Sequence, residues 1–227
     1  MSTTAAALAG RRELTFFRTT VGKKAAMAVS GVVLFGFVLA HLAGNLQIYE
    51  GPKKLDDYAR FLRSVPALLW GARIVLLAMV AVHIASSVQL ALIKRRARPI
   101  RYVKKETLQA NYATRTMYWS GPIVLCFIVY HLLHLTFGAV RLPFHEGDVY
   151  ANVVAGFQVV PVSLFYIVSM VLLGMHLNHG LWSLFQSLGL FHPRFTPLLK
   201  TLAGVLSLLI VVGNISIPIS VLAGWVK

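Results

Sequence analysis

Residues 159–186 read VVPVSLFYIVSMVLLGMHLNHGLWSLFQ, a stretch that contains no Asp, Glu, Lys or Arg. A helix needs about 20 predominantly apolar residues to cross the hydrocarbon core of a bilayer, so this stretch predicts a transmembrane helix. His176 lies deep inside it. A histidine in a lipid-embedded helix is energetically costly and usually faces the interior of a helix bundle. The stretch therefore predicts a bundle of membrane helices around a buried imidazole.

Four further stretches have the length and apolar character of membrane helices, at about 24–48, 67–93, 117–142 and 198–222. The chain is 57% hydrophobic and 13% charged, and its mean hydropathy is +0.71. These values lie outside the range of soluble globular proteins, and little sequence remains for a soluble domain. We therefore expect residues 1–227 to form a single all-α membrane domain, a bundle of five transmembrane helices.

The connection between the first two predicted helices contains the run LDDYARFLR at residues 55–63. Its apolar residues Leu55, Tyr58, Phe61 and Leu62 fall on one face at helical spacing. Pro66 follows shortly afterwards. The pattern predicts a short interfacial helix that lies on the outer membrane surface between the first two spans.

The basic residues gather on one side of the predicted bundle, and the formal charge of the chain is +15. With the N-terminus in the cytoplasm, 15 of the 22 Lys and Arg residues lie on the cytoplasmic side, against two of the seven acids, Glu13 and Glu106. These basic residues are Arg11, Arg12, Arg18, Lys23, Lys24, Lys94, Arg95, Arg96, Arg98, Arg101, Lys104, Lys105, Arg115, Arg194 and Lys200. This is the positive-inside pattern of a multi-pass protein of the bacterial inner membrane. It argues against nucleic-acid binding and offers a basic surface to anionic lipid or to an acidic partner.

Cys126, in the third apolar stretch, is the single cysteine of the chain. One cysteine excludes internal disulfides, cysteine-ligated iron–sulfur clusters and zinc ribbons. We expect Cys126 to be an ordinary helix-packing residue.

Four of the five predicted helices each contain an interior histidine, His41, His83, His131 or His176. At about 1.5 Å rise per residue, His41 and His131 lie about 26 and 21 Å from the cytoplasmic ends of their outward-running helices. By the same rise, His83 and His176 lie about 15 Å from the cytoplasmic ends of their inward-running helices. The four therefore form an outer pair, His41 with His131, and an inner pair, His83 with His176. Two pairs of imidazoles at two depths predict two stacked, six-coordinate haems.

Two more histidines, His134 and His179, lie three residues beyond His131 and His176 on nearby helix faces. Either residue of each couple is a candidate ligand by depth alone, because three residues change the depth by only about 4.5 Å. The other residue would then support the ligand from outside the ligand shell.

These residues resemble the five-helix, di-haem cytochrome b subunit of succinate dehydrogenases and fumarate reductases. The matching stretches are Ala40-His41-Leu42 through Asn45, Val82-His83, Tyr130-His131, Phe165-Tyr166-Ile167-Val168, and Met175-His176-Leu177-Asn178-His179-Gly180-Leu181-Trp182-Ser183. The resemblance covers nearly the whole chain, from about Phe17 to the last predicted helix. Its specificity lies in the order and spacing of four histidines together with the Gly-Leu-Trp-Ser ending.

The resemblance implies that one histidine from each of the first four helices ligates haem iron, the first helix with the third and the second with the fourth. It places the outer ligands at His41 and His131 and the inner ligands at His83 and His176, and it leaves His134 and His179 as additional histidines. It also implies two haem b groups, a quinone, expected to be menaquinone, and a flavoprotein and an iron–sulfur subunit on the cytoplasmic side. The chain would anchor that complex and carry electrons to quinone, while the dicarboxylate chemistry of the tricarboxylic acid cycle belongs to the partner subunits.

Two stacked haems are useful only if electrons cross from the inner face to the outer face. We therefore expect quinone to react near the outer haem, between the outer ends of the first two helices and the 55–63 segment. The residues Asn45, Gln47 and Tyr49 are candidates to hydrogen-bond the quinone carbonyls, and Glu50, Asp56 and Asp57 are candidates to handle its protons.

Two other readings compete with this prediction. The di-haem cytochrome b subunit of a nitrate reductase or hydrogenase also uses intramembrane histidines, but it distributes them over fewer helices. A proton-coupled transporter with a histidine relay would need no haem. The near absence of acids inside the predicted spans counts against the transporter, because proton relays usually include them.

Overall fold

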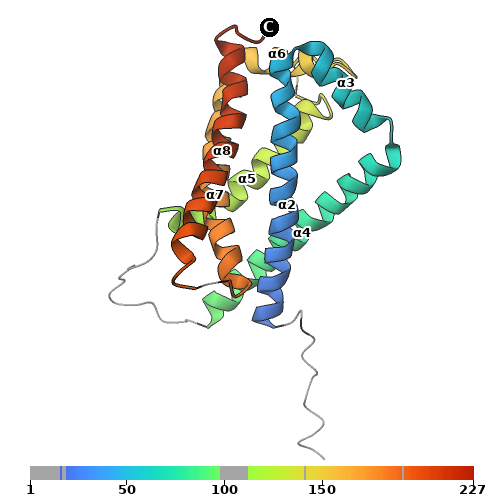
Figure 1. Ribbon diagram of the computed structural model, residues 1–227. Helices are drawn as coiled ribbons and strands as arrows, with labels where there is room; N and C mark the ends of the chain where they lie inside the picture. The colour runs from blue at the N-terminus through green and yellow to red at the C-terminus, as the bar shows by residue number, and fades with distance from the viewer. Residues whose placement is uncertain (1–15, 17–18, 98–111, 141, 191) are drawn as a thin grey trace, which may run out of the picture.

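The computed structural model describes residues 16, 19–97, 112–140, 142–190 and 192–227, without the side chains of 112–116 and 118, and its regular elements there are all helices (Figure 1). In chain order they are α2 (Thr20–Asn45), the 3-10 helix η2 (Leu46–Glu50), α3 (Pro52–Arg63), α4 (Pro66–Arg96), α5 (Tyr112–Leu135), α6 (Val149–Gln158), α7 (Val160–Ser187) and α8 (Thr196–Leu222). The predicted all-α class is confirmed for this part of the chain.

Among the described residues, four segments are long and apolar enough to cross a membrane, namely Thr20–Glu50, which joins α2 to η2, and the helices α4, α7 and α8. They coincide closely with the predicted spans at 24–48, 67–93, 159–186 and 198–222. The apolar described part of α5 is shorter and runs from Trp119 to Leu135. This part is about 25 Å long, against a hydrocarbon core of about 30 Å. The chain thus has the helices of a multi-pass membrane protein, and four of them reach spanning length.

The bounds predicted for the third helix, 117–142, are wrong at both ends. The helix α5 starts at Tyr112, so Pro122 lies in its interior rather than in its first turns. Hydropathy marks where lipid begins, whereas a helical backbone continues into the polar interface. At the other end Gly138 adopts a positive φ of 60°, and the Phe144 ring lies where a Cβ on Gly138 would be. That left-handed residue turns the chain back after Leu135.

Cys126 also departs from its prediction, because it is exposed rather than packed between helices. The helix α5 packs against α7 and α6, which leaves its remaining faces uncovered within the described chain. In a bilayer, such faces meet lipid.

The helix α6 has no counterpart among the predicted helices, because it lies in the connection between the stretches 117–142 and 159–186. Asp148 caps this helix, and its side-chain oxygen accepts a hydrogen bond of 2.9 Å from the backbone N–H of Ala151. The chain then breaks at Val159 in an extended conformation, and α7 begins with Pro161 in its first turn. An N-cap residue before an apolar run and a proline after it are the signals that would have separated the two helices.

The helices α2, α7 and α8 stand side by side, while α4 and α5 run obliquely to them (Figure 1). The helix α4 packs along α2, α5 packs along α7, and α7 packs along α8. One end of the bundle carries α3, α6 and the C-terminus (Figure 1). The buried cluster Ile48, Leu55, Phe157, Tyr166 and Val221 joins these elements to the membrane helices. This end corresponds to the outer side of the predicted topology.

The helix α3 covers the predicted 55–63 segment but begins three residues earlier, with Pro52 in its first turn. It is held at its start, where Leu55 is buried and the Tyr58 ring lies so close to Gly44 that a Cβ there would be 2.8 Å from it. Asp56 Oδ1 accepts a 3.0 Å hydrogen bond from the backbone N–H of Tyr150 in α6. At its other end Phe61 is 65% exposed, so the expected apolar face is only half covered by protein.

Candidate functional site

Two pairs of histidines meet inside the bundle. The rings of His41 on α2 and His131 on α5 have centroids 5.8 Å apart and lie edge to face, with 84° between their planes. The rings of His83 on α4 and His176 on α7 have centroids 6.3 Å apart at an interplanar angle of 59°. The structure therefore brings together the same residues that the depth argument paired.

The two pairs bridge helices that do not pack along each other. Within the described residues, neither α2 with α5 nor α4 with α7 forms a packed helix pair. Directly packed helices have axes about 8–10 Å apart. These ring contacts therefore join helices whose backbones do not pack against each other.

Two serines mark the inner level independently. Ser30 on α2 has its hydroxyl 3.2 Å from Nδ1 of His83, and Ser120 on α5 has its hydroxyl 3.4 Å from Nδ1 of His176. Each serine precedes the outer histidine of its own helix, His41 or His131, by eleven residues. Eleven residues of helix correspond to about 16 Å. The two histidine pairs thus lie at different depths.

The serine contacts also determine which imidazole nitrogen is available. The Ser30 hydroxyl donates its proton to the carbonyl oxygen of Ala26 at 2.8 Å, so it accepts a hydrogen bond from His83 Nδ1–H. A neutral imidazole carries one N–H, and therefore Nε2 of His83 keeps its lone pair. Metal-ligating histidines usually engage their second ring nitrogen in such a hydrogen bond. In His131, Nδ1 likewise lies 3.3 Å from a hydroxyl, that of Tyr166.

The residues fit haem iron. Metal–imidazole bonds are about 2 Å long, so two imidazoles on opposite sides of one metal have ring centroids about 6 Å apart. Both pairs have this spacing. The described chain contains no group of three or more His, Cys, Asp and Glu residues that could hold a metal ion. Two protein ligands per site suit a metal whose other ligands come from a porphyrin.

His134 and His179 are the two additional histidines. His134 is 4% exposed, its Nδ1 lies 2.9 Å from the Tyr166 hydroxyl, and its Nε2 lies where a Cβ on Gly156 would be. This geometry places His134 against α6 and α7, whereas His131 faces His41. His179 is partly buried on α7, three residues beyond His176.

Three of the six quinone-site candidates line one open hollow at the outer end. Gln47, Glu50 and Asp57 lie there with Lys54, Tyr58 and Phe61, around a volume of about 600 Å³. The other three, Asn45, Tyr49 and Asp56, do not line it. The Tyr49 hydroxyl donates to Ser216 Oγ at 2.8 Å, and Asp56 binds the start of α6.

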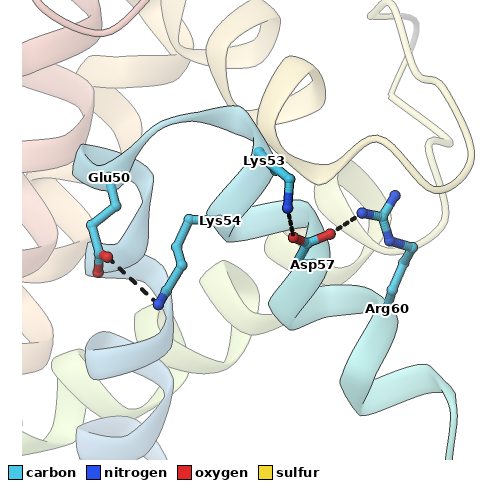
Figure 2. Close-up of polar contacts among 5 residues, drawn as sticks. All are labelled: Glu50, Lys53, Lys54, Asp57 and Arg60. Carbon is cyan, nitrogen blue, oxygen red and sulfur yellow. Dashed lines mark hydrogen bonds and ion pairs between the residues drawn. The ribbon is translucent and has the colours of Figure 1, made fainter.

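The carboxylates of the hollow are paired with basic residues of α3. Figure 2 shows Asp57 between Lys53, at 2.8 Å, and Arg60, and Glu50 at 3.6 Å from Lys54. Hydrogen bonds from Lys53 and Arg60 lower the pKa of Asp57. Asp57 therefore stays ionised as the pH falls towards the usual range of an aspartate, which makes it a poor proton donor to a quinone.

The sequence reasoning assigned no role to Ser30, Ser120 or Tyr166. The signal that would have found them is axial distance. Each serine lies eleven residues before an outer histidine, which puts it at the depth of the inner pair. Tyr166 lies ten residues, about 15 Å, before His176, which puts it at the depth of the outer pair.

The expected basic surface is described only in part. Lys94, Arg95 and Arg96 form the last turn of α4, and the Lys200 ammonium lies 4.8 Å from the ring of Trp182. The remaining members of this set lie outside the described residues, namely Arg11, Arg12, Glu13, Arg18, Arg98, Arg101, Lys104, Lys105, Glu106 and the side chain of Arg115.

Comparison with models of protein families, with curated proteins and with solved structures finds no match to this chain. The geometry of its own residues therefore carries the functional argument.

Proposed function

We propose that this chain is the membrane anchor and electron-transfer subunit of a succinate:quinone oxidoreductase. It would bind two b haems between an iron–sulfur subunit and a membrane quinone. The observation that carries the proposal is the pair of imidazole contacts, His41 with His131 and His83 with His176, at the spacing that two axial ligands of one iron require. The use of four different helices favours this class over the nitrate reductase and hydrogenase subunits.

The chain's own residues supply binding and orientation. His41 and His131 would hold the outer haem, and His83 and His176 the inner one. When bound, the two haems supply one-electron transfer across the membrane. Ser30 and Ser120 would orient the inner ligands by a hydrogen bond at Nδ1, which would leave Nε2 available to a metal.

The proposed topology includes α5 as a fifth span, with the N-terminus in the cytoplasm of a bacterium. Residues that precede Trp119 would lengthen α5 through the headgroup region, and five alternating passes follow the positive-inside rule. The exposed Phe61 and Leu62 would make α3 an interfacial helix, because apolar side chains beside basic ones favour the membrane surface. Trypsin access to the N-terminal segment in inverted and right-side-out vesicles tests this orientation.

Quinone, which we expect to be menaquinone, would react at the outer hollow. Gln47 would hydrogen-bond a carbonyl and Glu50 would exchange protons with the quinone, since both line the hollow. Asp57 would remain ionised and hold Lys53 and Arg60 in place. The Tyr58 and Phe61 rings supply an apolar wall.

The first prediction is haem content. The purified chain should contain two low-spin haems per polypeptide, because it has two imidazole pairs and each pair fills both axial positions. Neither haem should bind carbon monoxide readily. Pyridine haemochrome quantitation with reduced and CO-difference spectra measures both properties. A stoichiometry of one or none would contradict the proposal, and a protein without haem would favour the histidine-relay transporter.

The second prediction concerns the partner subunits. Replacing Lys94, Arg95 and Arg96 together with Gln should weaken binding of the iron–sulfur subunit roughly tenfold at low salt, as expected for three exposed charges. The loss should shrink at high salt, because screening already weakens such contacts. Arg63, Arg73 and Lys227, changed together to Gln at the opposite end, form the control. Equal copurification of the partner with both triple variants at low salt would remove the assigned docking face.

A further inference from the structure

The hydroxyl of Tyr166 lies between two imidazoles of α5. It is 3.3 Å from Nδ1 of His131 and 2.9 Å from Nδ1 of His134. Tyr166 is 6% exposed and His134 4% exposed, so water does not compete for these bonds. The Phe127 and Phe157 rings stand edge to face with the Tyr166 ring, at centroid distances of 5.2 and 4.8 Å, and hold it in position.

The number of available protons gives one direction to each bond when His131 binds a metal through Nε2. A phenol has one proton to donate and lone pairs to accept with, and each neutral imidazole has one N–H. If His131 gives Nε2 to a metal, its proton must be on Nδ1, and it donates to the Tyr166 oxygen. The phenol proton is then directed to Nδ1 of His134, across the shorter of the two distances. His134 accordingly carries its own proton on Nε2.

A glycine in a neighbouring helix holds the far end of this chain of bonds in place. A Cβ on Gly156 would lie 2.4 Å from Nε2 of His134, so only glycine allows α6 to approach that imidazole. The inner ligands meet serine hydroxyls at Nδ1 instead of a phenol. Their partners are Ser30 and Ser120, and Ser30 donates to a backbone carbonyl rather than to a second imidazole.

We propose that Tyr166 and His134 are positioning residues for the outer haem, which hold His131 with its proton on Nδ1 and lower the reduction potential of that haem. The inference rests on the proposed haem-binding function. A hydrogen bond accepted from Nδ1–H makes the imidazole a stronger donor to the metal, which stabilises ferric iron. His134 strengthens the effect, because a hydroxyl that donates a hydrogen bond becomes a better acceptor.

The test is the reduction potential of each haem in the purified chain with Tyr166→Phe. This change keeps the ring and removes only the oxygen. We expect the ferrous-to-ferric ratio of the outer haem to rise about tenfold at a fixed potential, equivalent to about 59 mV for a one-electron couple. The low-spin ferric EPR signal of the outer haem should shift as well, and the inner haem should change in neither respect. Tyr130→Phe, the same change in a neighbouring ring of this aromatic cluster, is the matched control.

His134→Leu is the second variant. It should shift the outer potential in the same direction but by less, because Tyr166 still accepts from His131. If Tyr166→Phe binds two haems and the reduction potential of its outer haem equals that of the Tyr130→Phe control, the inference is overturned and the proposed function stands. An equal shift of both haems would also overturn it. A parent protein without haem would overturn the proposed function itself.

Discussion

His176→Ala is expected to lower the haem content from two per chain to one, and His83→Ala is expected to remove the same haem. Their rings form one contact, so the loss of either would leave the proposed haem iron with a single protein ligand. His41→Ala and His131→Ala should remove the other haem, since those rings form the second contact. Haem quantitation with redox titration of the four variants measures which haem is lost.

Two histidines outside the two proposed ligand pairs, His145 and His134, provide the controls for this series. His145→Ala changes an exposed residue of the connection before α6 and should retain both haems. His134→Ala should also retain both, because His134 is turned towards Tyr166 and Gly156. Loss of the outer haem in His134→Ala with its retention in His131→Ala would exchange the two assignments. Loss of different haems in His83→Ala and His176→Ala would refute the pairing.

Glu50→Gln is expected to reduce quinone-linked turnover at least tenfold while both haems remain. A positioned proton donor or acceptor commonly contributes about 100-fold or more to a rate. Glu50 lines the outer hollow and is 3.6 Å from Lys54, and the amide that replaces it cannot exchange protons. The measurement is turnover with a soluble quinone analogue, beside reduction of the haems by dithionite.

Asp56→Asn is the matched control for this substitution. Asp56 lies outside the hollow, and an amide oxygen can still accept the hydrogen bond from the Tyr150 N–H. Turnover should therefore stay near that of the parent. Full activity in Glu50→Gln, or an inhibitor bound at the cytoplasmic end, would contradict the outer quinone site.

Sequence patterns predicted the long helices well because hydrophobic length is a local property. The stretches 67–93 and 198–222 fall inside α4 and α8, and depth alone paired His41 with His131. The same reasoning did not separate α6 from the connection before the fourth predicted helix, and it extended the third helix past Leu135. Those ends depend on the Asp148 cap and on the left-handed Gly138, which hydropathy does not register.

Contacts across helices were beyond the reach of such patterns. The spacing of Tyr166 gives its depth along α7 but does not distinguish it from its neighbour Phe165, and its contacts depend on the two imidazoles of α5 that it meets. The sequence likewise could not choose among the quinone-site candidates, because the choice depends on how α3 packs against η2. In the structure Glu50 and Asp57 line the hollow, whereas Asp56 accepts a hydrogen bond from the backbone of α6.

The exposed position of Cys126 makes it a suitable attachment site for a spin label that measures distances. It is the only cysteine in the sequence and lies on the surface of α5, so a thiol-reactive nitroxide would attach at one site without any other thiol being removed. Along the axis of α5, Cys126 lies between Ser120 and His131, about 9 Å from the first and about 7.5 Å from the second. A spin label there would stand between the two ligand levels. If the proposed haems are bound, its relaxation would report the approach of each paramagnetic iron separately as the other is reduced.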